Sequence, residues 1–373
     1  MKKYSRKLRL REVAIFFVTL FFMLLSGMPA KAGTAPFAFH MLDVGQGQSV
    51  LVEADGHYML IDGGGRSSSS FVVSYLQQQG VEKLDYIVVS HYDEDHISGI
   101  VGALHVFECE TILAPDYYAD TDIYASYLTA AEASGAEIIY PQQGETYALG
   151  DAVITVVGPA SYENTLENDR SVAVRITYGI TGYLICGDAQ AQEEEDISNS
   201  GLELASDVYV VNHHGSAESS GFYFLNRVQP MYALISCSAD NAYGHPAAET
   251  MQRLDSEGVS LYRTDRQGTV TAYSDGAGLW FDQNPCDDFS SRQADGQGAV
   301  NLDISGQNGS GQQEASDSGN RGTTYVCNLN TKKFHYTYCD SVNRMKETNK
   351  KFTDESRESL IAQGYDPCKN CNP

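Results

Sequence analysis

The sequence predicts an α/β domain of about 250 residues, followed by a linker and a small second domain. Three observations support this organisation. The 373 residues are 42% apolar, which is typical of globular chains. Short β-branched or apolar runs alternate with amphipathic stretches from Phe37 to about Asp282. Residues 284–321 are rich in Gly, Ser, Gln, Asp and Asn, and aromatic residues and cysteines return after them.

The amino terminus has the composition of a secretory signal peptide. Residues 2–11 are rich in Lys and Arg, residues 13–25 form a 13-residue apolar run, and Ala30-Lys31-Ala32 follows. A retained membrane anchor is the alternative, but such a run is shorter than the roughly 20 apolar residues that span a bilayer. We expect a signal peptide at 1–32 and a secreted, extracellular protein without a transmembrane domain after its removal; association with the cell surface stays open.

The chain is strongly acidic. It has 49 Asp and Glu against 25 Lys and Arg, a formal charge of −24, and removal of residues 1–32 would bring the charge to about −30. A surface of this sign repels polyanions, which argues against generic binding of nucleic acid through the whole surface. A nucleic-acid role therefore requires a local site.

Periodicity predicts the elements of the first domain, residues 33–283, in order. Period-2 or continuous apolar runs predict strands at 39–42, 49–53, 58–61, 86–89, 111–113, 152–157, 172–178, 182–186, 207–211, 232–236 and 269–273. Helical spacing predicts helices at 70–79, 97–105, 121–134, 190–199, 219–227 and 247–257. The residues between 284 and 321 form the predicted linker, and residues 322–373 form the second domain.

The most informative segment follows the predicted strand at 86–89. His91, Asp93, Asp95 and His96 lie within six residues, at the point where the strand ends and a helix begins. In such a turn, His91 and Asp93 can point to one side while Asp95 and His96 reach from the helix start to another. Mixed imidazole and carboxylate ligands placed in this way suit two neighbouring divalent ions.

This segment, His-x-Asp-x-Asp-His, resembles the signature of the metallo-β-lactamase superfamily in a variant with Asp at the second position. With residues 39–49, residues 60–64 and several later motifs, the chain resembles the extracellular hydrolase domain of ComEC-type competence proteins over about residues 37–275. The resemblance implies a four-layer αββα metallo-β-lactamase fold and hydrolase chemistry. The large membrane channel of the competence proteins is absent here, so DNA transport is not implied.

Four later residues match the pattern of this family. Asp188 ends the strand at 182–186 after Gly187, where a carboxylate can bridge two metals. His213 and His214 follow the strand at 207–211, and His245 precedes Pro246. The resemblance implies that His214 is a metal ligand and leaves a ligand, outer-shell or general-acid role open for His213 and His245. We expect metal ligands at His91, Asp93, Asp95, His96, Asp188 and His214, and catalytic roles for Asp95, His213 and His245.

Such a site would polarise an ester oxygen and lower the pKa of a water molecule from 15.7 toward about 7. Zn²⁺ is the expected metal, with Mn²⁺ as the alternative. Asn168 and Ser171 lie in a polar turn that resembles one of the family, and Arg266 carries a guanidinium that matches phosphate geometry. We expect these three residues to bind substrate, although turn stabilisation explains them equally well.

The second domain contains a separate cluster of metal-ligating residues. His335 and Cys339, then Cys368 and Cys371, have the spacing of a closed tetrahedral zinc site, which can stabilise a domain of about 50 residues. The domain also resembles the metal-binding domain of Ada-type DNA repair proteins, with His335 in place of the first cysteine. The alternative is a disulfide, Cys368–Cys371 or Cys339–Cys368. We expect a small zinc-binding α+β module that contacts a partner, DNA or cell wall.

Together these features predict an exported hydrolase with two divalent ions and one structural zinc ion. The favoured activity is hydrolysis of a phosphodiester, with extracellular DNA as the substrate implied by the resemblance. One alternative is another ester, such as a wall-polymer phosphodiester, a lactone or a small phosphoester. A second is a metal-containing surface protein that binds a partner without catalysis.

Overall fold

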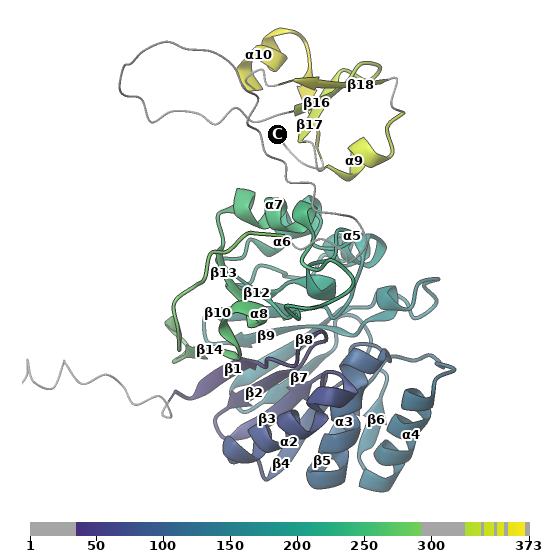
Figure 1. The fold of residues 1–373 in the computed structure, drawn as a ribbon, viewed down its shortest axis with the longest axis vertical. Helices are drawn as coiled ribbons and strands as arrows, with labels where there is room; N and C mark the ends of the chain where they lie inside the picture. The colour runs from purple at the N-terminus through teal and green to yellow at the C-terminus, as the bar shows by residue number, and fades with distance from the viewer. Residues whose placement is uncertain (1–34, 292–324, 337–338, 347–348, 354–356, 370–373) are drawn as a thin grey trace, which may run out of the picture. The chain divides into compact units, whose positions relative to one another are not determined.

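A computed structural model describes residues 35–291, 325–336, 339–346, 349–353 and 357–369. The predicted signal peptide and residues 292–321 of the predicted linker lie outside these ranges. Residues 36–291 form two β-sheets with helices on their outer faces (Figure 1). Among the described residues, no helix combines the length and the apolar character that crossing a membrane requires.

The first sheet has eight strands in the order β15-β14-β1-β2-β3-β4-β5-β6. Its bounds are β1 (Phe37–Met41), β2 (Val50–Ala54), β3 (His57–Ile61), β4 (Lys83–Val88), β5 (Glu108–Leu113), β6 (Glu137–Ile139), β14 (Val270–Ser274) and β15 (Leu279–Phe281). The strands β3 to β6 are parallel, and helices on one face connect them. These helices are α2 (Ser69–Gln78), α3 (Glu94–Val106) and α4 (Asp122–Ser134), with the 3₁₀ turn η1 (Arg66–Ser68) before α2.

The second sheet has seven strands in the order β13-β12-β11-β10-β9-β8-β7. Its bounds are β7 (Thr146–Leu149), β8 (Ala152–Gly158), β9 (Ala173–Tyr178), β10 (Thr181–Ile185), β11 (Val208–Val210), β12 (Tyr232–Ile235) and β13 (Ser260–Arg263). The helices of this half are α5 (Ala191–Asn199), α6 (Phe222–Val228), α7 (Ala248–Glu257) and the short α8 (Thr264–Gln267), with 3₁₀ turns η2 (Asn168–Arg170) and η3 (Asn212–Gly215).

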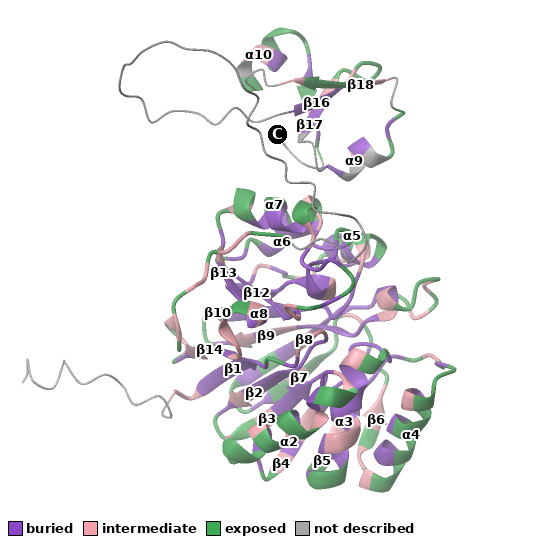
Figure 2. Cartoon of the chain, in the orientation of Figure 1, coloured by how far each residue is buried: buried purple, intermediate pink, exposed green. Residues whose placement is uncertain are grey.

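Three apolar clusters define four layers. Alternate residues of β10 show how this arises, because Tyr183 and Ile185 pack between the sheets while Leu184 packs against the outer helices. One cluster joins the two sheets, a second joins the first sheet to α2, α3 and α4, and a third joins the second sheet to α5, α6 and α7. The buried strands and the exposed outer faces of the helices are visible in Figure 2. The predicted αββα arrangement is confirmed.

Four strands of the two large sheets were not predicted from the sequence. All eleven strands predicted there are present, but β6, β7, β13 and β15 were not expected. Each has only three or four residues, and β6, β7 and β15 have exposed residues that interrupt the apolar pattern. Such short edge strands are stabilised by pairing with a neighbour more than by local propensity.

The first residues of the predicted linker contact the first domain. Residues 284–291 were assigned to the linker because they are polar, and they form hydrogen bonds with β13 at the edge of the second sheet. The Asp287 carboxylate accepts a hydrogen bond from Leu261 N at 2.9 Å, and the Arg263 guanidinium donates to the carbonyls of Asp288 and Ser290 at 2.8 and 2.7 Å. Composition alone does not reveal these contacts with backbone groups.

The second domain forms its own four-stranded sheet in the order β18-β16-β17-β19. Its elements are β16 (Tyr325–Asn328), β17 (Lys333–Tyr336), α9 (Asp340–Asn343), β18 (Lys350–Thr353), α10 (Arg357–Ala362) and β19 (Asp366–Pro367). Small apolar clusters that include Val326, Phe334 and Leu360 stabilise this α+β unit.

A close crossing of α3 over the loop after β3 generates a prediction. A Cβ atom on Gly99 would lie 1.9 Å from the carbonyl oxygen of Gly63. Although Ala has the higher helix propensity, we expect Gly99→Ala to lower the free energy of unfolding by about 1–3 kcal/mol because backbone atoms must move apart. In the same helix, a Cβ on Gly102 would clash with the Ser69 hydroxyl, which can rotate, and would make ordinary van der Waals contact with Val73. Chemical denaturation should therefore show a smaller loss for Gly102→Ala, and equal stabilities would contradict the argument.

Candidate metal centre

The first half of the site lies where β4 ends and α3 begins. His91 is completely buried in the turn after the strand, and Asp93 is the N-cap residue of α3. Asp95 and His96 follow in the first turn of the helix. Carboxylates at this position are stabilised by the positive end of the helix dipole. The turn therefore holds all four predicted ligands of this segment at one edge of the first sheet.

The second half comes from the other sheet. Asp188 follows β10, and His213 and His214 follow β11, the parallel neighbour of β10, so both segments leave the sheet at the same edge. Gly187 has φ +54°, and a Cβ atom there would lie 2.6 Å from the Cβ atom of Ser90. The absence of a side chain lets the Asp188 turn approach the first half closely.

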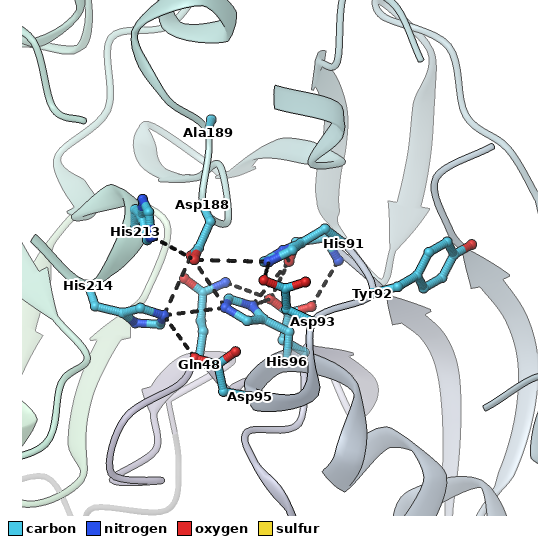
Figure 3. Close-up of polar contacts among 12 residues, drawn as sticks. Gln48, His91, Tyr92, Asp93, Asp95, His96, Asp188, Ala189, His213 and His214 are labelled. Atoms are coloured by element: carbon cyan, nitrogen blue, oxygen red, sulfur yellow. Dashed lines mark hydrogen bonds and ion pairs between the residues drawn. The ribbon is translucent and has the colours of Figure 1, made fainter. Parts of the chain in front are cut away.

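The side chains of both halves converge on the Asp188 carboxylate (Figure 3). The Nε2 atoms of His96 and His214 lie 3.3 and 3.6 Å from its Oδ1 atom. Those of His213 and His91 lie 3.6 and 4.0 Å from its Oδ2 atom. Two sets have ligand atoms within 4.8 Å of one another, namely His91, His96 and Asp188, and Asp95, His96 and His214. Asp93 completes the predicted group, with Oδ2 3.5 Å from Nε2 of His91.

The hydrogen bonds at the Nδ1 atoms of three histidines show which ring nitrogen is available to bind a cation. The Nδ1 atom of His96 lies 2.8 Å from Asp62 Oδ2, and that of His214 lies 3.0 Å from Ser236 O. His91 Nδ1 lies 3.0 Å from the Ser90 hydroxyl, which donates its own proton to Asp62. In the neutral form of each ring, Nδ1 therefore carries the proton, which leaves the Nε2 lone pairs directed into the site.

These lone pairs face each other and the carboxylates. His96 Nε2 and His214 Nε2 are 3.3 Å apart. Among the described residues, His91 Nε2 and Asp188 Oδ1 are buried and have no hydrogen-bond partner. Buried acceptors without donors are costly unless a cation satisfies them. The donor set of imidazole nitrogens and carboxylate oxygens therefore fits divalent ions such as zinc.

The electrostatics of the site also favour positive charge at its centre. Burial disfavours the charged forms, but the carboxylates of Asp188 and Asp62 outweigh burial and raise the pKa of His96 well above its usual value. Burial of Asp188 is likewise outweighed by His214, His96 and His91, which hold its pKa well below the usual range. Burial alone would raise the pKa of Asp95, but His214 and His96 outweigh it, and the pKa lies below its usual value.

One residue at the centre of this network was not among the predicted site residues. Asp62 is fully buried, directly after β3. Its carboxylate accepts hydrogen bonds from Gln48 Nε2 at 2.9 Å, from Ser90 N and Oγ at 2.8 and 2.7 Å, and from His96 Nδ1 at 2.8 Å. The sequence signal that could have identified Asp62 is its position between an apolar strand and two glycines. Asp62 fixes the ring orientation of His96.

His213 differs from the other histidines. Its Nδ1 atom lies 3.4 Å from Gln190 Nε2, an amide nitrogen that can only donate. This contact favours the tautomer with the proton on Nε2, directed toward Asp188 3.6 Å away. Burial lowers the pKa of His213, so the neutral ring is favoured. The geometry suits a hydrogen-bond donor better than a metal ligand.

His245 lies beside the two histidines of η3. Its ring centroid is 5.3 Å from that of His213 and 6.4 Å from that of His214. Burial, followed by His213 and His214, lowers its pKa to about 4. On its other face the exposed ring of Tyr243 stacks at 5.7 Å. The structure brings His245 to the site, but neither metal-ligating set includes it.

The three predicted substrate-binding residues occupy different environments. Ser171 is completely buried, with its hydroxyl 3.2 Å from the position of a Cβ on Gly187, so it lies behind the Asp188 turn. Asn168 is partly exposed and begins η2. The Arg266 guanidinium pairs with Asp288 at 2.8 Å. A buried hydroxyl and a neutralised guanidinium are poorly placed to receive a phosphate, and their predicted role now has little geometric support.

Two consecutive glutamates of α5 hold the loops on either side of the site. Glu193 accepts hydrogen bonds from Ala160 N at 2.9 Å and Asn164 Nδ2 at 3.0 Å. Glu194 accepts them from Asn212 Nδ2 and Gly221 N, both at 2.8 Å, and from Ser220 N. Both carboxylates are buried. The first fixes the loop before η2, and the second fixes the segment that contains His213 and His214.

In the second domain, three of the four predicted zinc ligands come together. His335, Cys339 and Cys368 are buried, with ligand atoms within 4.8 Å of one another. His335 Nδ1 lies 3.4 Å from Cys339 Sγ, and the Cys339 and Cys368 sulfur atoms are 4.0 Å apart. This separation is about twice the length of an S–S bond, so the alternative Cys339–Cys368 disulfide is not formed. Cys371 lies outside the described residues.

The buried Glu193 carboxylate generates a pH prediction. Burial, followed by the nearby Asp196 and Asp169, raises its pKa from 4.5 to about 8. Between these values the folded chain keeps a proton that the unfolded chain has lost, so the free energy of unfolding should fall as pH rises, by at most about 1.4 kcal/mol per pH unit. Denaturation from about pH 5 to 8 should show a smaller fall for Glu193→Gln. The control is Glu195→Gln, because Glu195 is the exposed neighbour of Glu193. If the unfolding free energy of Glu193→Gln falls with pH as steeply as that of the wild type and of Glu195→Gln, this explanation is wrong.

Comparison with known proteins agrees with this geometry. Residues 42–238 match the family described as the metallo-beta-lactamase superfamily. The chain is 27% identical over 248 residues to ComE operon protein 3 of Bacillus subtilis, with 62% of this chain and 32% of that protein covered. It is 31% identical over 267 residues to competence protein ComA of Neisseria gonorrhoeae, with 71% and 36% covered.

The chain thus spans about a third of the length of these two curated relatives. Among solved structures, the metallo-beta-lactamase fold protein YhfI from Bacillus subtilis aligns with a TM-score of 0.41 and 14% identity, over 65% of this chain and 99% of that one. The family match covers more than half of the chain and includes the His91–His96 segment and Asp188. The chain belongs to the metallo-β-lactamase superfamily of hydrolases.

Proposed function

We propose that this chain is an exported hydrolase with two divalent metal ions that cleaves phosphodiesters, with extracellular DNA as its substrate. One observation carries the proposal. The Nε2 lone pairs of His91, His96 and His214 point into one buried space around the Asp188 carboxylate. Among the described residues, His91 Nε2 and Asp188 Oδ1 in that space have no hydrogen-bond partner. This arrangement is expensive in a protein that only binds a partner.

The residues of the site have distinct proposed roles. His91, Asp93, Asp95, His96, Asp188 and His214 would hold the two ions. The ions would polarise a phosphoester oxygen and lower the pKa of an attacking water molecule. Asp62 and the Ser236 carbonyl keep the rings of His96 and His214 in the required tautomer. His213, with its proton on Nε2, is placed to donate a hydrogen bond that stabilises negative charge developing on the phosphoester.

The choice of substrate rests on the relatives and on charge. One curated relative is competence protein ComA of Neisseria gonorrhoeae, and another is recombination protein 2 of Haemophilus influenzae, 26% identical over 234 residues. A specific observation favours a second candidate, a small or uncharged ester. Residues 36–291 contain 38 Asp and Glu but only eight Lys and Arg, which repels a polyanion.

The proposed chemistry predicts the effect of two substitutions in the same segment. Asp95→Asn should lower metal-dependent cleavage of DNA at least about 100-fold, because it removes the charge of a proposed ligand. Glu94→Gln should leave cleavage nearly unchanged, since its carboxylate is exposed and lies 3.6 Å from Arg66. The full chain is assayed with Zn²⁺ or Mn²⁺ on single-stranded and linear DNA and on small phosphoesters and lactones.

The outcomes separate the alternatives. Cleavage of DNA that Asp95→Asn loses and Glu94→Gln keeps supports the proposal. If two bound metals are measured and only a small ester or lactone is cleaved, the DNA substrate is wrong. If no substrate is cleaved and Asp95→Asn changes nothing, the chain is better explained as a binding protein.

For the second domain we propose a structural zinc ion held by His335, Cys339, Cys368 and Cys371, in a module that contacts DNA or the cell wall. Cys339→Ser should remove about one equivalent of zinc from the full chain and destabilise this domain, because the site supplies folding free energy. Cys109→Ser, in the apolar core of the first domain, should keep the zinc content unchanged. Elemental analysis of the purified variants measures this. Equal zinc contents would contradict the proposed site.

A further inference from the structure

A strongly acidic domain that binds a polyanion needs a cation at the site itself. The eight Lys and Arg residues among residues 36–291 can be sorted by their partners. Four form ion pairs with carboxylates, namely Arg66, Lys83, Arg263 and Arg266. These four are neutralised within the chain and are poor candidates for a phosphate contact.

The other four arginines hydrogen bond to backbone carbonyls. Arg175 donates to Ala205 O, Arg227 to Leu202 O, and Arg253 to Ala217 O and Ser219 O. Each of these contacts involves the terminal Nη2 atom. Arg170 differs, because its one hydrogen bond of this kind, to Asn164 O at 2.7 Å, uses the Nε atom. No carboxylate among the described residues lies within 4.0 Å of its guanidinium nitrogens.

Arg170 is also attached to the metal-ligating segment. Its guanidinium carbon lies 5.1 Å from the ring centroid of Tyr117, an arrangement that fixes a cation over an aromatic face. The Tyr117 hydroxyl accepts a hydrogen bond at 3.0 Å from the backbone N–H of Tyr92, the residue between His91 and Asp93. Two residues after Arg170, Val172 N donates to Ser90 O at 2.8 Å. The guanidinium is therefore held at the His91 and Asp93 side of the site.

We propose that Arg170 binds a phosphate group adjacent to the one that is cleaved, so that its subsite selects substrates with more than one phosphate. Its Nε atom and its ring partner fix the plane, and Nη1 and Nη2 remain for a bidentate contact with two phosphate oxygens. The subsite rests on the proposed phosphodiesterase function. It assigns the phosphate contact to the η2 turn, where Asn168 and Ser171 also lie.

A cycle that changes enzyme and substrate together tests this contact. Metal-loaded full chain, Arg170→Ala, Arg170→Lys and the control Arg227→Ala are assayed on a short single-stranded oligothymidylate. In a second series of oligonucleotides, one phosphate beside the cleaved linkage is replaced by an uncharged methylphosphonate. Arg227, in α6, is a matched control, because it is exposed and donates to the Leu202 carbonyl without an ion pair among the described residues.

We expect Arg170→Ala to raise KM for the unmodified oligonucleotide about 10- to 100-fold with little change in kcat, since the contact lies away from the reacting atoms. Neutralising the adjacent phosphate should raise KM of the wild type by a similar factor and should not raise it further in Arg170→Ala. Arg170→Lys should recover part of the loss, and Arg227→Ala should behave as the wild type. Two outcomes would overturn the subsite. One is an increase in KM for Arg170→Ala on the modified oligonucleotide equal to the product of the two separate increases; the other is an unchanged KM for Arg170→Ala on the unmodified oligonucleotide.

Failure of the subsite and failure of the proposed function give different results. If the wild type cleaves the oligonucleotide and the cycle shows no coupling, only the subsite is wrong. If the wild type cleaves no oligonucleotide, the DNA proposal fails, and the same cycle is then read by fluorescence anisotropy of labelled oligonucleotides. Binding that depends jointly on Arg170 and one phosphate would retain the contact, and its absence would overturn it.

Discussion

The hydrogen bonds accepted by the buried Asp62 carboxylate are the interaction on which the metal centre depends. One carboxylate joins Gln48 from the loop before β2, Ser90 from the turn after β4 and His96 from α3. A buried charge is tolerated only when donors surround it, and here the donors are the groups that must be oriented. Through Ser90 the same network reaches Nδ1 of His91. Buried groups behind the metal-ligating atoms therefore fix the orientation of the ligands.

The two sheets make the site possible because each supplies an incomplete set. The first sheet provides His91, Asp93, Asp95 and His96, and the second provides Asp188, His213 and His214. The apolar cluster between the sheets therefore also determines the distance between the two halves. The close approach of the Gly187 turn to Ser90 shows how little space that packing leaves. Stability of the core and geometry of the site are consequently coupled in this fold.

Much of this arrangement could be predicted from the sequence, and what could not has physical causes. Alternating apolar residues predicted the eleven strands that pack in the core, and the spacing of His91 to His96 predicted a turn between strand and helix. The short edge strands and residues 284–291 escaped prediction because they are stabilised by partners far along the chain. Arg266 matched a phosphate-binding pattern, but its neutralisation by Asp288 depends on tertiary contacts. Asp62 and Arg170 acquire significance only through neighbours that sequence spacing does not reveal.

Glu193 and Glu194 have a consequence for how the site can move. They are adjacent in α5, yet one carboxylate holds the loop at residues 160–164 and the other holds residues 212–221. A tilt or shift of α5 would displace both loops together. The two loops are therefore coupled to each other through one helix. A movement of one loop relative to the other would require the hydrogen bonds of Glu193 or Glu194 to break.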